Sequence, residues 1–548
     1  MAMTQPGNTT TAAGRPLAGI ERLSDLLASR AGYTGDCIVD QRETLSWDEL
    51  AQRSRAVAAG FAELGVGLGD RVAVWLPNRA AWLVSFLACA QLGAITVSIN
   101  TRFRSAEIGD LLRRSAARLL VYWPGFKDID FGNILAQCAE ENLSKLQAII
   151  LYTEDGSATP AAIVGKPAKA WSELAAKPPM LQVLGTPDSP CLIFTTSGTT
   201  KAPKLVVHRQ RTVLSHASNV SHQYGLTPED RFLLLPPFCG VYGFSSAMSA
   251  LAAGTPLILA PTWSPSLFAD LIDTHKVTHL TASNEAVAQL LESRPGNHAL
   301  PSVKLIVSAN LNPTYSDIAA RGEAKGVQVI GLYGSSELHA LFSHCDRSAP
   351  ADIRGRAGGT PASALAKVRT RDPESRQLCK PGEAGELEVF APESRFVEYL
   401  DDPESTKAAF TEDGYFRTGD LAMLEADGSF TYLGRMGDTL RLGGFLVAPA
   451  EIEELLQEHP AVQACQIVGV QVKDAIRPVA FVTQRRNGVA KEAELIAYAA
   501  ERVAKYKVPV RVFVMDEFPT TPSANGTKIQ KGKLREIAQV KLASGSAS

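Results

Sequence analysis

The chain has 548 residues, of which 45% are hydrophobic and 20% are charged, and 55 basic side chains nearly balance 57 acidic ones. This composition is that of a folded globular protein and excludes a disordered, collagen-like or disulfide-stabilised chain; at ~150 residues per domain the length provides three or four units. The formal net charge of −2 excludes a strongly basic face that would hold nucleic acid or an anionic membrane.

The eight cysteines are scattered, and no two of them form a C-x-x-C pair. A disulfide framework or a zinc site is therefore not expected, and a reducing cytoplasmic location fits best. The first fourteen residues are polar and do not form a signal peptide. Two uncharged stretches of about twenty residues, Ala80–Ile99 and Val241–Ala260, are expected to form buried helices followed by strands rather than membrane spans.

From residue 45 the chain alternates between helices and strands. Ser46 and Glu49 have the spacing of a capping box at the start of a helix. A strand is predicted at 71–76, a helix at 80–91 and another strand at 94–99. Similar apolar runs recur at 117–122, 148–152, 191–194, 256–259, 304–307 and 327–332. Strands separated by helices predict parallel sheets in a large α/β body.

The pattern changes near residue 360. Short strands at 366–370, 385–390 and 430–433, separated by Gly, Pro and Asp turns, predict a small β unit. After the glycine pair at 443–444, helices at 449–458 and 491–505 belong to a compact, lid-like domain. The predicted divisions are a flexible stretch at 1–15, a body at 16–436, a lid at 437–540 and a disordered tail at 541–548.

The strongest local signal lies directly after the apolar strand 191–194. The segment Phe194–Lys204 combines five hydroxyl side chains, the flexible Gly198 and two lysines, Lys201 and Lys204. Such a loop can bind a polyphosphate through backbone N–H groups, hydroxyls and ammonium charge. It lacks the Gly-Lys-Ser/Thr spacing of a Walker A loop, and an ordinary polar surface loop is an equal alternative for this segment alone.

Four weaker motifs follow. Residues 331–337 offer an aromatic ring at Tyr333 and a carboxylate at Glu337 that suits Mg²⁺. Asp420 follows a tight glycine turn and can accept hydrogen bonds from both hydroxyls of a ribose. The segments 434–438 and 525–531 complete the set. Each of the four, taken alone, is better explained as an ordinary turn or helix start.

Taken together and in this order, the five motifs resemble those of the adenylate-forming superfamily of acyl- and aryl-CoA ligases, nonribosomal adenylation domains and beetle luciferases. The resemblance runs from Leu45 to Arg535. It implies an α/β fold with a large N-terminal AMP-binding body of two α/β sheet subdomains plus the small β unit, and a small mobile α+β C-terminal lid. It further implies an ATP-dependent acid–CoA ligase that forms an acyl-adenylate with release of pyrophosphate, and then acyl-CoA and AMP. ATP, Mg²⁺ and CoA are the expected cofactor and co-substrates.

The resemblance assigns roles residue by residue. Thr200 and Glu337 would lie near Mg²⁺, and Lys528 would bridge the α-phosphate and the substrate carboxylate as the main catalytic residue. Asp420 would bind the ribose hydroxyls with the help of Arg435. The residues expected to bind ATP or AMP are Thr196, Ser197, Gly198, Thr199, Thr200, Lys204, Ser308, Ala309, Asn310, Tyr333, Gly334, Ser335, Ser336, Asp420 and Arg435. After rotation of the lid about Gly437, the loop of Gly443, Gly444 and Phe445 would meet the pantetheine thiol of CoA.

Several positions depart from the family pattern. Lys201 and Leu205 stand where glycines are usual, and Gly437 replaces the usual Asp or Lys at the hinge. Thr527 is an extra residue before Lys528. We assign the bridging role to Lys528, with Lys531 as the alternative.

The expected acyl pocket contains Gly240, Val241, Tyr242 and Leu332. The family has an aromatic residue or His at the position of Gly240, so we expect a larger pocket and a bulky acid: aryl, polycyclic, or medium- to long-chain acyl. Refilling of this gap by Tyr242 or another ring is an equal alternative. No Asp can be placed in the pocket to bind an α-amino group, which argues against amino acid activation, and the role of Glu285 stays open.

Three rival functions remain. An acyl-AMP ligase that loads a carrier-protein phosphopantetheine is the nearest, although no insertion in the N-terminal body marks it. A luciferase-like use of O₂ has no specific support. A non-catalytic relative would have lost Lys204, Glu337, Asp420 or Lys528, and all four are present. The expected partners are the acid, ATP and CoA, without nucleic acid or an integral membrane segment, and a homodimer is left open.

Overall fold

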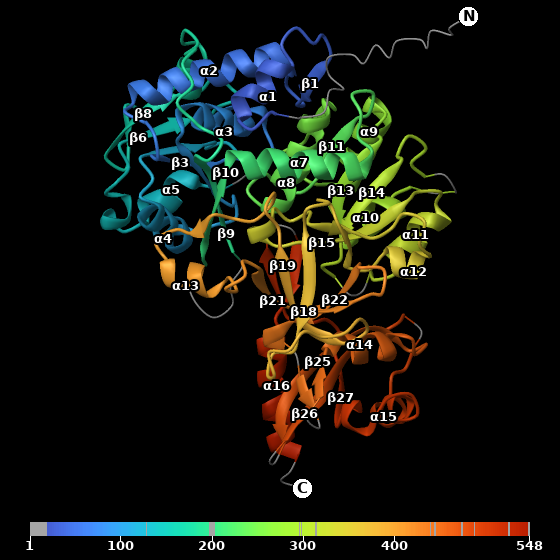
Figure 1. The fold of residues 1–548 in the computed structure, drawn as a ribbon. Helices are drawn as coiled ribbons and strands as arrows, with labels where there is room; N and C mark the ends of the chain where they lie inside the picture. Colours follow the sequence, from blue (N-terminus) through green and yellow to red (C-terminus); the bar gives the residue numbers. More distant parts are fainter. Residues whose placement is uncertain are drawn as a thin grey trace, which may run out of the picture.

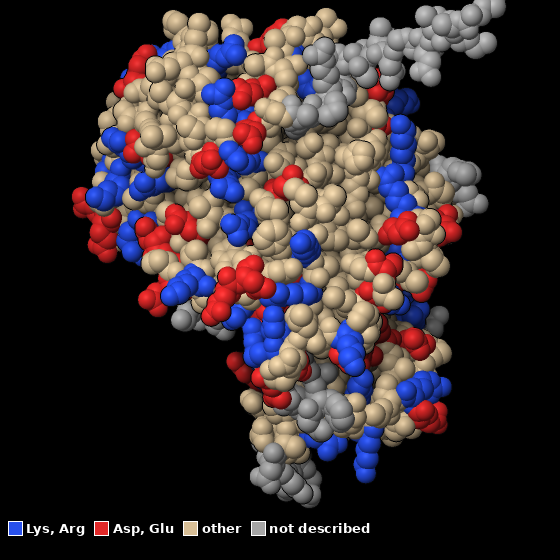
Figure 2. All heavy atoms as spheres, viewed as in Figure 1, with Lys and Arg blue, Asp and Glu red and all other residues tan. Residues whose placement is uncertain are grey.

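The structure is a computed structural model that describes residues 19–127, 129–196, 203–294, 296, 299–312, 315–438, 440–442, 445–472, 475–486, 488–523 and 526–545. Two large sheets and their helices form the body, and the C-terminal domain lies below them as a separate lobe, coloured orange to red in Figure 1. Acidic and basic side chains are interspersed over the face shown in Figure 2, as the near-neutral net charge predicts.

The first sheet has a parallel centre and antiparallel edges. Among the described residues its strand order is β20 (Glu398–Tyr399), β10 (Leu205–Arg209), β9 (Pro190–Thr195), β4 (Ile95–Ser98), β3 (Arg71–Trp75), β5 (Leu119–Tyr122), β6 (Ala148–Leu151), β8 (Lys166–Ala170) and β7 (Ala162–Ile163). Strands β9 to β8 run parallel, as the alternation of strands and helices predicts, whereas β20, β10 and β7 pair antiparallel. The parallel prediction is therefore correct for the centre and wrong for the edges, where hairpin and return connections replace helical crossovers.

The second sheet extends much further than the sequence indicates. Its strand order is β18 (Lys367–Arg371), β19 (Ala384–Phe390), β21 (Phe416–Leu424), β22 (Phe430–Arg435), β17 (Gly358–Pro361), β16 (Ser343–His344), β15 (Val329–Tyr333), β14 (Leu305–Ala309), β13 (His279–Ser283), β11 (Phe232–Leu234), β12 (Leu257–Leu259), β1 (Asp36–Val39) and β2 (Thr44–Ser46). The small β unit continues this sheet through the antiparallel strands β16 and β17, because β15 would otherwise present an unpaired edge.

Two apolar helices join the sheets. All 13 residues of α3 (Ala80–Leu92) are buried, and nearly all of α8 (Val241–Ala253) are. The rings of Trp82 and Phe238 stack with centroids 5.0 Å apart, and Phe86 meets Phe244 edge to face at 4.9 Å. Each helix ends at a left-handed glycine, as predicted. Their uncharged sequences reflect this interior packing, and within the described part of the chain no helix is long and apolar enough to cross a membrane.

The remaining helices of the body cover the two sheets. Helix α2 (Trp47–Glu63) begins with the predicted capping box of Ser46 and Glu49. The others are α1 (Leu23–Ser29), α4 (Ser105–Ser115), α5 (Phe131–Ala136), α6 (Trp171–Ala175), α7 (Gln210–Tyr224), α9 (Pro265–His275), α10 (Asn284–Glu292), α11 (Ile318–Ala324), α12 (Ala351–Arg354) and α13 (Pro403–Ala408).

The C-terminal domain begins after a short 3₁₀ turn, Met436–Asp438. Its elements are β23 (Leu440–Leu442), β24 (Phe445–Val447), α14 (Pro449–Gln457), β25 (Val462–Val472), β26 (Ala475–Gln484), α15 (Glu492–Ala500), β27 (Arg511–Val514), β28 (Thr520–Ser523), β29 (Gly526–Ile529) and α16 (Lys531–Gly545). Helix α14 packs against β22 of the body. The predicted division at 436–437 lies at the 3₁₀ turn.

Two predictions for this domain are wrong. Helix α15 ends at Ala500 rather than Lys505, and the non-helical backbone of Ala504, with φ −57° and ψ 144°, separates it from the 3₁₀ turn Lys505–Lys507. The tail predicted to be disordered from residue 541 is helical to Gly545. Leu534, Ala538 and Leu542 recur every four residues and pack on one apolar cluster, which stabilises the extra turn. The stretches 1–15 and 546–548 lie outside the described residues.

Candidate active site

Residues of three motifs that are separate in the sequence meet at the end of β15. Antiparallel pairing of β21 with β22 sets Asp420 opposite Arg435, with 3.1 Å between Oδ1 and Nε. Tyr333, the last residue of β15, donates a hydrogen bond from Oη to Asp420 Oδ2 at 2.6 Å. Asp420 is 2% exposed, whereas the Arg435 side chain is 56% exposed. The site therefore presents a buried carboxylate next to an accessible guanidinium.

Burial determines the protonation of this group. Desolvation raises the pKa of Asp420 to about 6, although Arg435 and the Tyr333 hydroxyl partly offset the shift and nearby Glu337 adds to it. Burial, followed by the charge of Asp420, raises the pKa of Tyr333 well above its usual value. At neutral pH Asp420 is thus an anion that accepts hydrogen bonds, and Tyr333 keeps its proton.

Lys204, the last residue of the segment predicted to bind a polyphosphate, lies near Tyr399 and Glu337. Thr196 and Lys204 close the base of the loop: Thr196 N donates to Lys204 O at 2.9 Å, and Lys204 N donates to Thr196 Oγ1 at 3.0 Å. Lys204 Nζ lies 4.2 Å from the ring centroid of Tyr399, whose hydroxyl donates to Glu337 Oε1 at 2.9 Å. Tyr399 was not predicted from sequence. The loop residues between them that were predicted to bind phosphate or metal lie outside the described residues: Ser197, Gly198, Thr199 and Thr200.

A buried amide organises the turn after β14. Asn284, fully buried, donates from Nδ2 to Asn310 Oδ1 and to the Asn312 carbonyl, each at 2.6 Å, and its Oδ1 accepts the backbone N–H groups of Leu311 and Asn312. It thereby fixes the backbone that follows Ser308 and Ala309. The sequence signal was its place directly after β13, at the edge where the parallel strands end. Its neighbour Glu285 faces Asn312, with 3.5 Å between Oε2 and Nδ2.

Three histidines that the sequence did not single out support Ser336. His208 Nε2 lies 2.8 Å from the Ser336 carbonyl oxygen, and since a carbonyl only accepts, this nitrogen carries the proton. The ring of His339 lies 3.8 Å from that of His208 and 5.4 Å from that of His216. Burial lowers the pKa of His208 to about 4 and that of His216 to about 3. The cluster is therefore neutral and positions the 335–337 turn without adding charge.

The turn that carries Gly334 has no room for a side chain. A Cβ on Gly334 would lie 1.2 Å from the carbonyl oxygen of Ala340, and one on Gly331 would lie 1.8 Å from that of Arg356. The backbone of residues 334–340 folds back on itself here, which brings Ser335, Ser336 and Glu337 to the strand end. Glycine at these two positions is thus required by close backbone contacts.

Gly334→Ala is expected to destabilise the protein by about 3 kcal/mol, because backbone rather than a flexible side chain blocks the new methyl group. Unfolding in urea measures this effect. Gly532→Ala is the matched control, since nothing lies within 4 Å of a Cβ there, and it should not destabilise the protein. Wild-type stability of the Gly334 variant would show that the turn rearranges readily.

Three of the four residues predicted to line an acyl pocket lie at the start of α8, and the fourth, Leu332, lies in β15. Gly240 is the N-cap of this helix with φ −102°, a conformation open to any residue. Tyr242 is buried, and its hydroxyl donates to the carbonyl oxygens of Ala282 at 3.0 Å and Val307 at 2.9 Å. These contacts hold its ring against β13 and β14. Val241 and Leu332 are also buried.

The two lysines considered for the bridging role lie in different elements of the C-terminal domain. Lys528 lies in β29, opposite Thr521 of β28. Lys531 Nζ forms an ion pair with Glu453 Oε1 at 2.9 Å, and the same carboxylate oxygen accepts the Ile467 N–H at 2.8 Å. Lys531 thus joins α16 to α14 within the C-terminal domain. Gly443 and Gly444 lie outside the described residues, and Phe445 begins β24.

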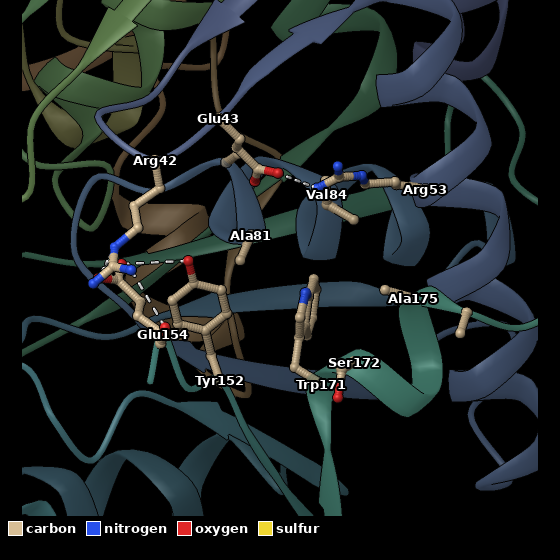
Figure 3. A pocket seen from close by; sticks show the side chains of 12 residues that line it. Arg42, Glu43, Arg53, Ala81, Val84, Tyr152, Glu154, Trp171, Ser172 and Ala175 are labelled. Atoms are coloured by element: carbon tan, nitrogen blue, oxygen red, sulfur yellow. Dashed lines mark hydrogen bonds and ion pairs between the residues drawn. The ribbon is translucent and has the colours of Figure 1, made fainter. Parts of the chain in front are cut away.

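A cavity of about 450 Å³ lies away from these residues, in the N-terminal subdomain (Figure 3). Its charged lining is neutralised in pairs, since Arg42 pairs with Glu154 at 3.0 Å and Arg53 pairs with Glu43. None of the predicted site residues lines it. A second cavity is bordered by residues of β17, β18 and the 428 turn. In the described part of the chain no cluster of three or more His, Cys, Asp or Glu side chains could hold a metal ion.

Comparison with known proteins shows to which family the chain belongs. Residues 28–394 match the family described as AMP-binding enzyme, and residues 451–525 match the AMP-binding enzyme C-terminal domain. A sulfoacetate–CoA ligase of Cupriavidus necator is 30% identical over 524 residues, which cover 94% of this chain and 97% of that protein. A feruloyl-CoA synthase of an Amycolatopsis species is 30% identical over 496 residues, or 90% and 93%.

Solved structures of CoA ligases have a similar fold. An anthranilate CoA ligase in complex with anthranoyl-AMP has a TM-score of 0.81 at 25% identity and covers 97% of this chain and 100% of its own. An o-succinylbenzoate CoA synthetase of Bacillus subtilis in complex with AMP has a TM-score of 0.76 at 25% identity, over 93% and 98%. The chain belongs to the AMP-binding enzyme family of adenylate-forming proteins. Within it, the chain is of the AMP-forming acid–CoA ligase class.

Proposed function

We propose that the enzyme uses ATP to convert a carboxylic acid into an acyl-adenylate with release of pyrophosphate, and then transfers the acyl group to CoA. The observation that carries this proposal is the convergence of Lys204, Glu337, Asp420 and Arg435 at one edge of the body. This edge combines cationic groups for phosphates with a buried anion for hydroxyls. An attack by a carboxylate on a phosphorus atom brings two anions together, so positive charge and positioning supply most of the catalysis.

The nucleotide would lie with its ribose hydroxyls on Asp420 and its adenine beside Tyr333 and the turn at 308–310. Arg435 would add a donor near the ribose. Ser336 would face the α-phosphate, and Lys204 would bind the β- and γ-phosphates. Lys528 would enter from the lid to contact the acid and the α-phosphate. The loop at 443–445 would later guide the CoA thiol.

The residues present suit one Mg²⁺ ion held together with the nucleotide. Glu337 is a half-buried carboxylate, and Thr200 would be its companion. Mg²⁺ is commonly bound by one or two carboxylates plus substrate phosphates rather than by an all-protein site, which agrees with the lack of a larger acidic cluster among the described residues. When bound, the ion would offset the negative charge of the phosphates.

Product analysis by mass spectrometry tests this function. Purified protein receives ATP, Mg²⁺ and a panel of fatty, aryl and polycyclic acids, with and without CoA. AMP together with an acyl-CoA is the expected result. Acyl-adenylate that persists after CoA is added would instead identify the ligase that loads a carrier protein. No product from a broad panel would contradict the proposal.

We further propose that the acid is bulky, with an aryl, polycyclic or medium- to long-chain group. Gly240 presents no side chain at the start of α8, and the hydroxyl contacts of Tyr242 hold that ring on β13 and β14. The sulfoacetate and feruloyl acids named for the relatives differ in size, so the relatives do not decide the acid.

Gly240→Phe should lower kcat/KM for the best bulky acid about 100-fold, while kcat/KM for acetate or propionate stays within about twofold, because acids of that size do not need the volume that the ring would fill. Steady-state pyrophosphate release with acids of increasing width measures this. Gly240→Ala serves as control and should behave like wild type. A wild-type preference for two- or three-carbon acids would refute the bulky-acid proposal.

A further inference from the structure

Tyr399 is brought to Lys204 by the edge pairing of the first sheet. Strand β20 pairs antiparallel with β10, with Tyr399 opposite Val206 and Leu400 N donating to Leu205 O at 2.8 Å. Lys204 precedes Val206 by two residues and therefore lies on the same face of the sheet. It is thus a diagonal cross-strand neighbour of Tyr399, within reach of a long side chain. The observed separation of 4.2 Å between Nζ and the ring centroid follows from this register.

The ring of Tyr399 is firmly fixed. Only 5% of the residue is exposed, and its ring packs on that of Phe396 with centroids 4.7 Å apart. Its backbone N–H donates to Thr406 Oγ1 at 2.9 Å. The Phe396 N–H donates to the Glu337 carbonyl oxygen at 2.8 Å, which holds the Glu337 backbone beside the same strand. A rigid ring in this place can position both of the groups that it touches.

Those two groups have opposite charges. The ammonium of Lys204 lies over the ring face, and the carboxylate of Glu337 accepts the hydroxyl hydrogen bond at 2.9 Å. Within the described part of the chain neither residue forms an ion pair. A direct ion pair between Lys204 and Glu337 would neutralise both the ammonium proposed to bind phosphates and the carboxylate proposed to bind the metal. A cation–π contact holds the ammonium without neutralising it.

We propose that Tyr399 is a positioning residue for adenylation: its ring holds Lys204 and its hydroxyl holds Glu337, so that both stay apart and available for the triphosphate and its Mg²⁺. This inference rests on the proposed function and adds to it a residue outside the five sequence motifs. The two halves of the contact are separable by substitution. Tyr399→Phe keeps the ring and loses the hydroxyl, whereas Tyr399→Leu loses both.

The test is adenylate formation with ATP and Mg²⁺ varied independently. Tyr399→Phe should leave KM for ATP within about twofold of wild type but raise the half-saturating Mg²⁺ concentration about fivefold, since only the Glu337 hydrogen bond is lost. Tyr399→Leu should also raise KM for ATP about tenfold or more, because Lys204 loses its support. Thioester formation from supplied acyl-adenylate should stay unchanged in both variants.

Tyr415→Leu is the matched control. It removes a similar contact in the same region, where the guanidinium of Arg369 lies 3.7 Å from the ring centroid of Tyr415, and it should change neither constant. Wild-type Mg²⁺ dependence in Tyr399→Phe would overturn the hydroxyl role, and equal ATP KM values in the Phe and Leu variants would overturn the ring role. The Phe variant keeps the packing, so it decides the hydroxyl role even where the Leu variant unfolds. A wild-type enzyme that forms no adenylate would instead refute the proposed function.

Discussion

Lys528→Ala is expected to lower acyl-adenylate formation about 100- to 1,000-fold while thioester formation from supplied acyl-adenylate largely survives. The lysine is proposed to stabilise charge only in the first half-reaction, where the acid attacks the α-phosphate. The two half-reactions are measured separately, by pyrophosphate release without CoA and by acyl-CoA formation from synthetic acyl-adenylate. A separation of the two rates is the expected signature.

Lys531→Ala provides the control for this experiment. Its ammonium pairs with Glu453 inside the lid, so its loss should lower stability by about 1–3 kcal/mol and affect both half-reactions alike. Thermal unfolding and the ratio of the two rates distinguish the variants. Equal loss of both half-reactions in Lys528→Ala would assign a structural role to that loop, and a selective loss in Lys531→Ala would transfer the bridging role to Lys531.

Asp420→Asn is expected to weaken ATP binding and to stabilise the unliganded protein at the same time. The ionised carboxylate is the proposed acceptor for the ribose hydroxyls, so KM for ATP should rise about tenfold or more at pH 8. Burial raises the pKa of Asp420 from 3.8 to about 6, so ionisation of this group opposes folding. The neutral amide removes that cost while still accepting the Tyr333 hydrogen bond.

The pH dependence has a definite sign. The folded chain holds the Asp420 proton more tightly than the unfolded chain does, and this difference stabilises the fold. The stabilisation is complete below pH 3.8, where the carboxyl is protonated in both states. It is lost as the pH rises through 6, where the carboxyl of the folded chain ionises. The shift corresponds to about 3 kcal/mol at most. The Asn variant should therefore exceed wild type in Tm at pH 8 and lose that advantage toward pH 4. Wild-type KM for ATP should rise as pH falls below 6.

Asp427→Asn is the control for this substitution, because Asp427 only caps the turn at Ser429 on the surface. It should leave KM for ATP unchanged. An unchanged KM in Asp420→Asn would remove Asp420 from the ribose site. A lower Tm at pH 8 would mean that the ion pair with Arg435 outweighs the cost of burial.

Local sequence patterns determined most of the secondary structure and suggested the residues of the candidate site. Ser46 and Glu49 cap α2 within four residues of each other, and Gly93 and Gly254 end their helices, so short-range geometry was sufficient. The motifs around Tyr333, Asp420 and Lys204 could also be recognised from the residue types of a few adjacent positions. The errors fell where a distant contact decides, as in the extra turn of α16, which Leu542 stabilises by packing against the lid core.

Only the tertiary structure decided which of these parts work together. Tyr399 joins Lys204 to Glu337 through the β10–β20 register, Asn284 fixes a turn 26 residues away from it, and His208 supports Ser336 from 128 residues away. Lys531 joins α16 to α14 by its pairing with Glu453. The sequence by itself determined the class of the protein and most of its helices and strands, because motifs, helix and strand periods, caps and glycine turns act over a few residues. The positioning residues depend on strand register and helix packing, which join positions that no local pattern connects.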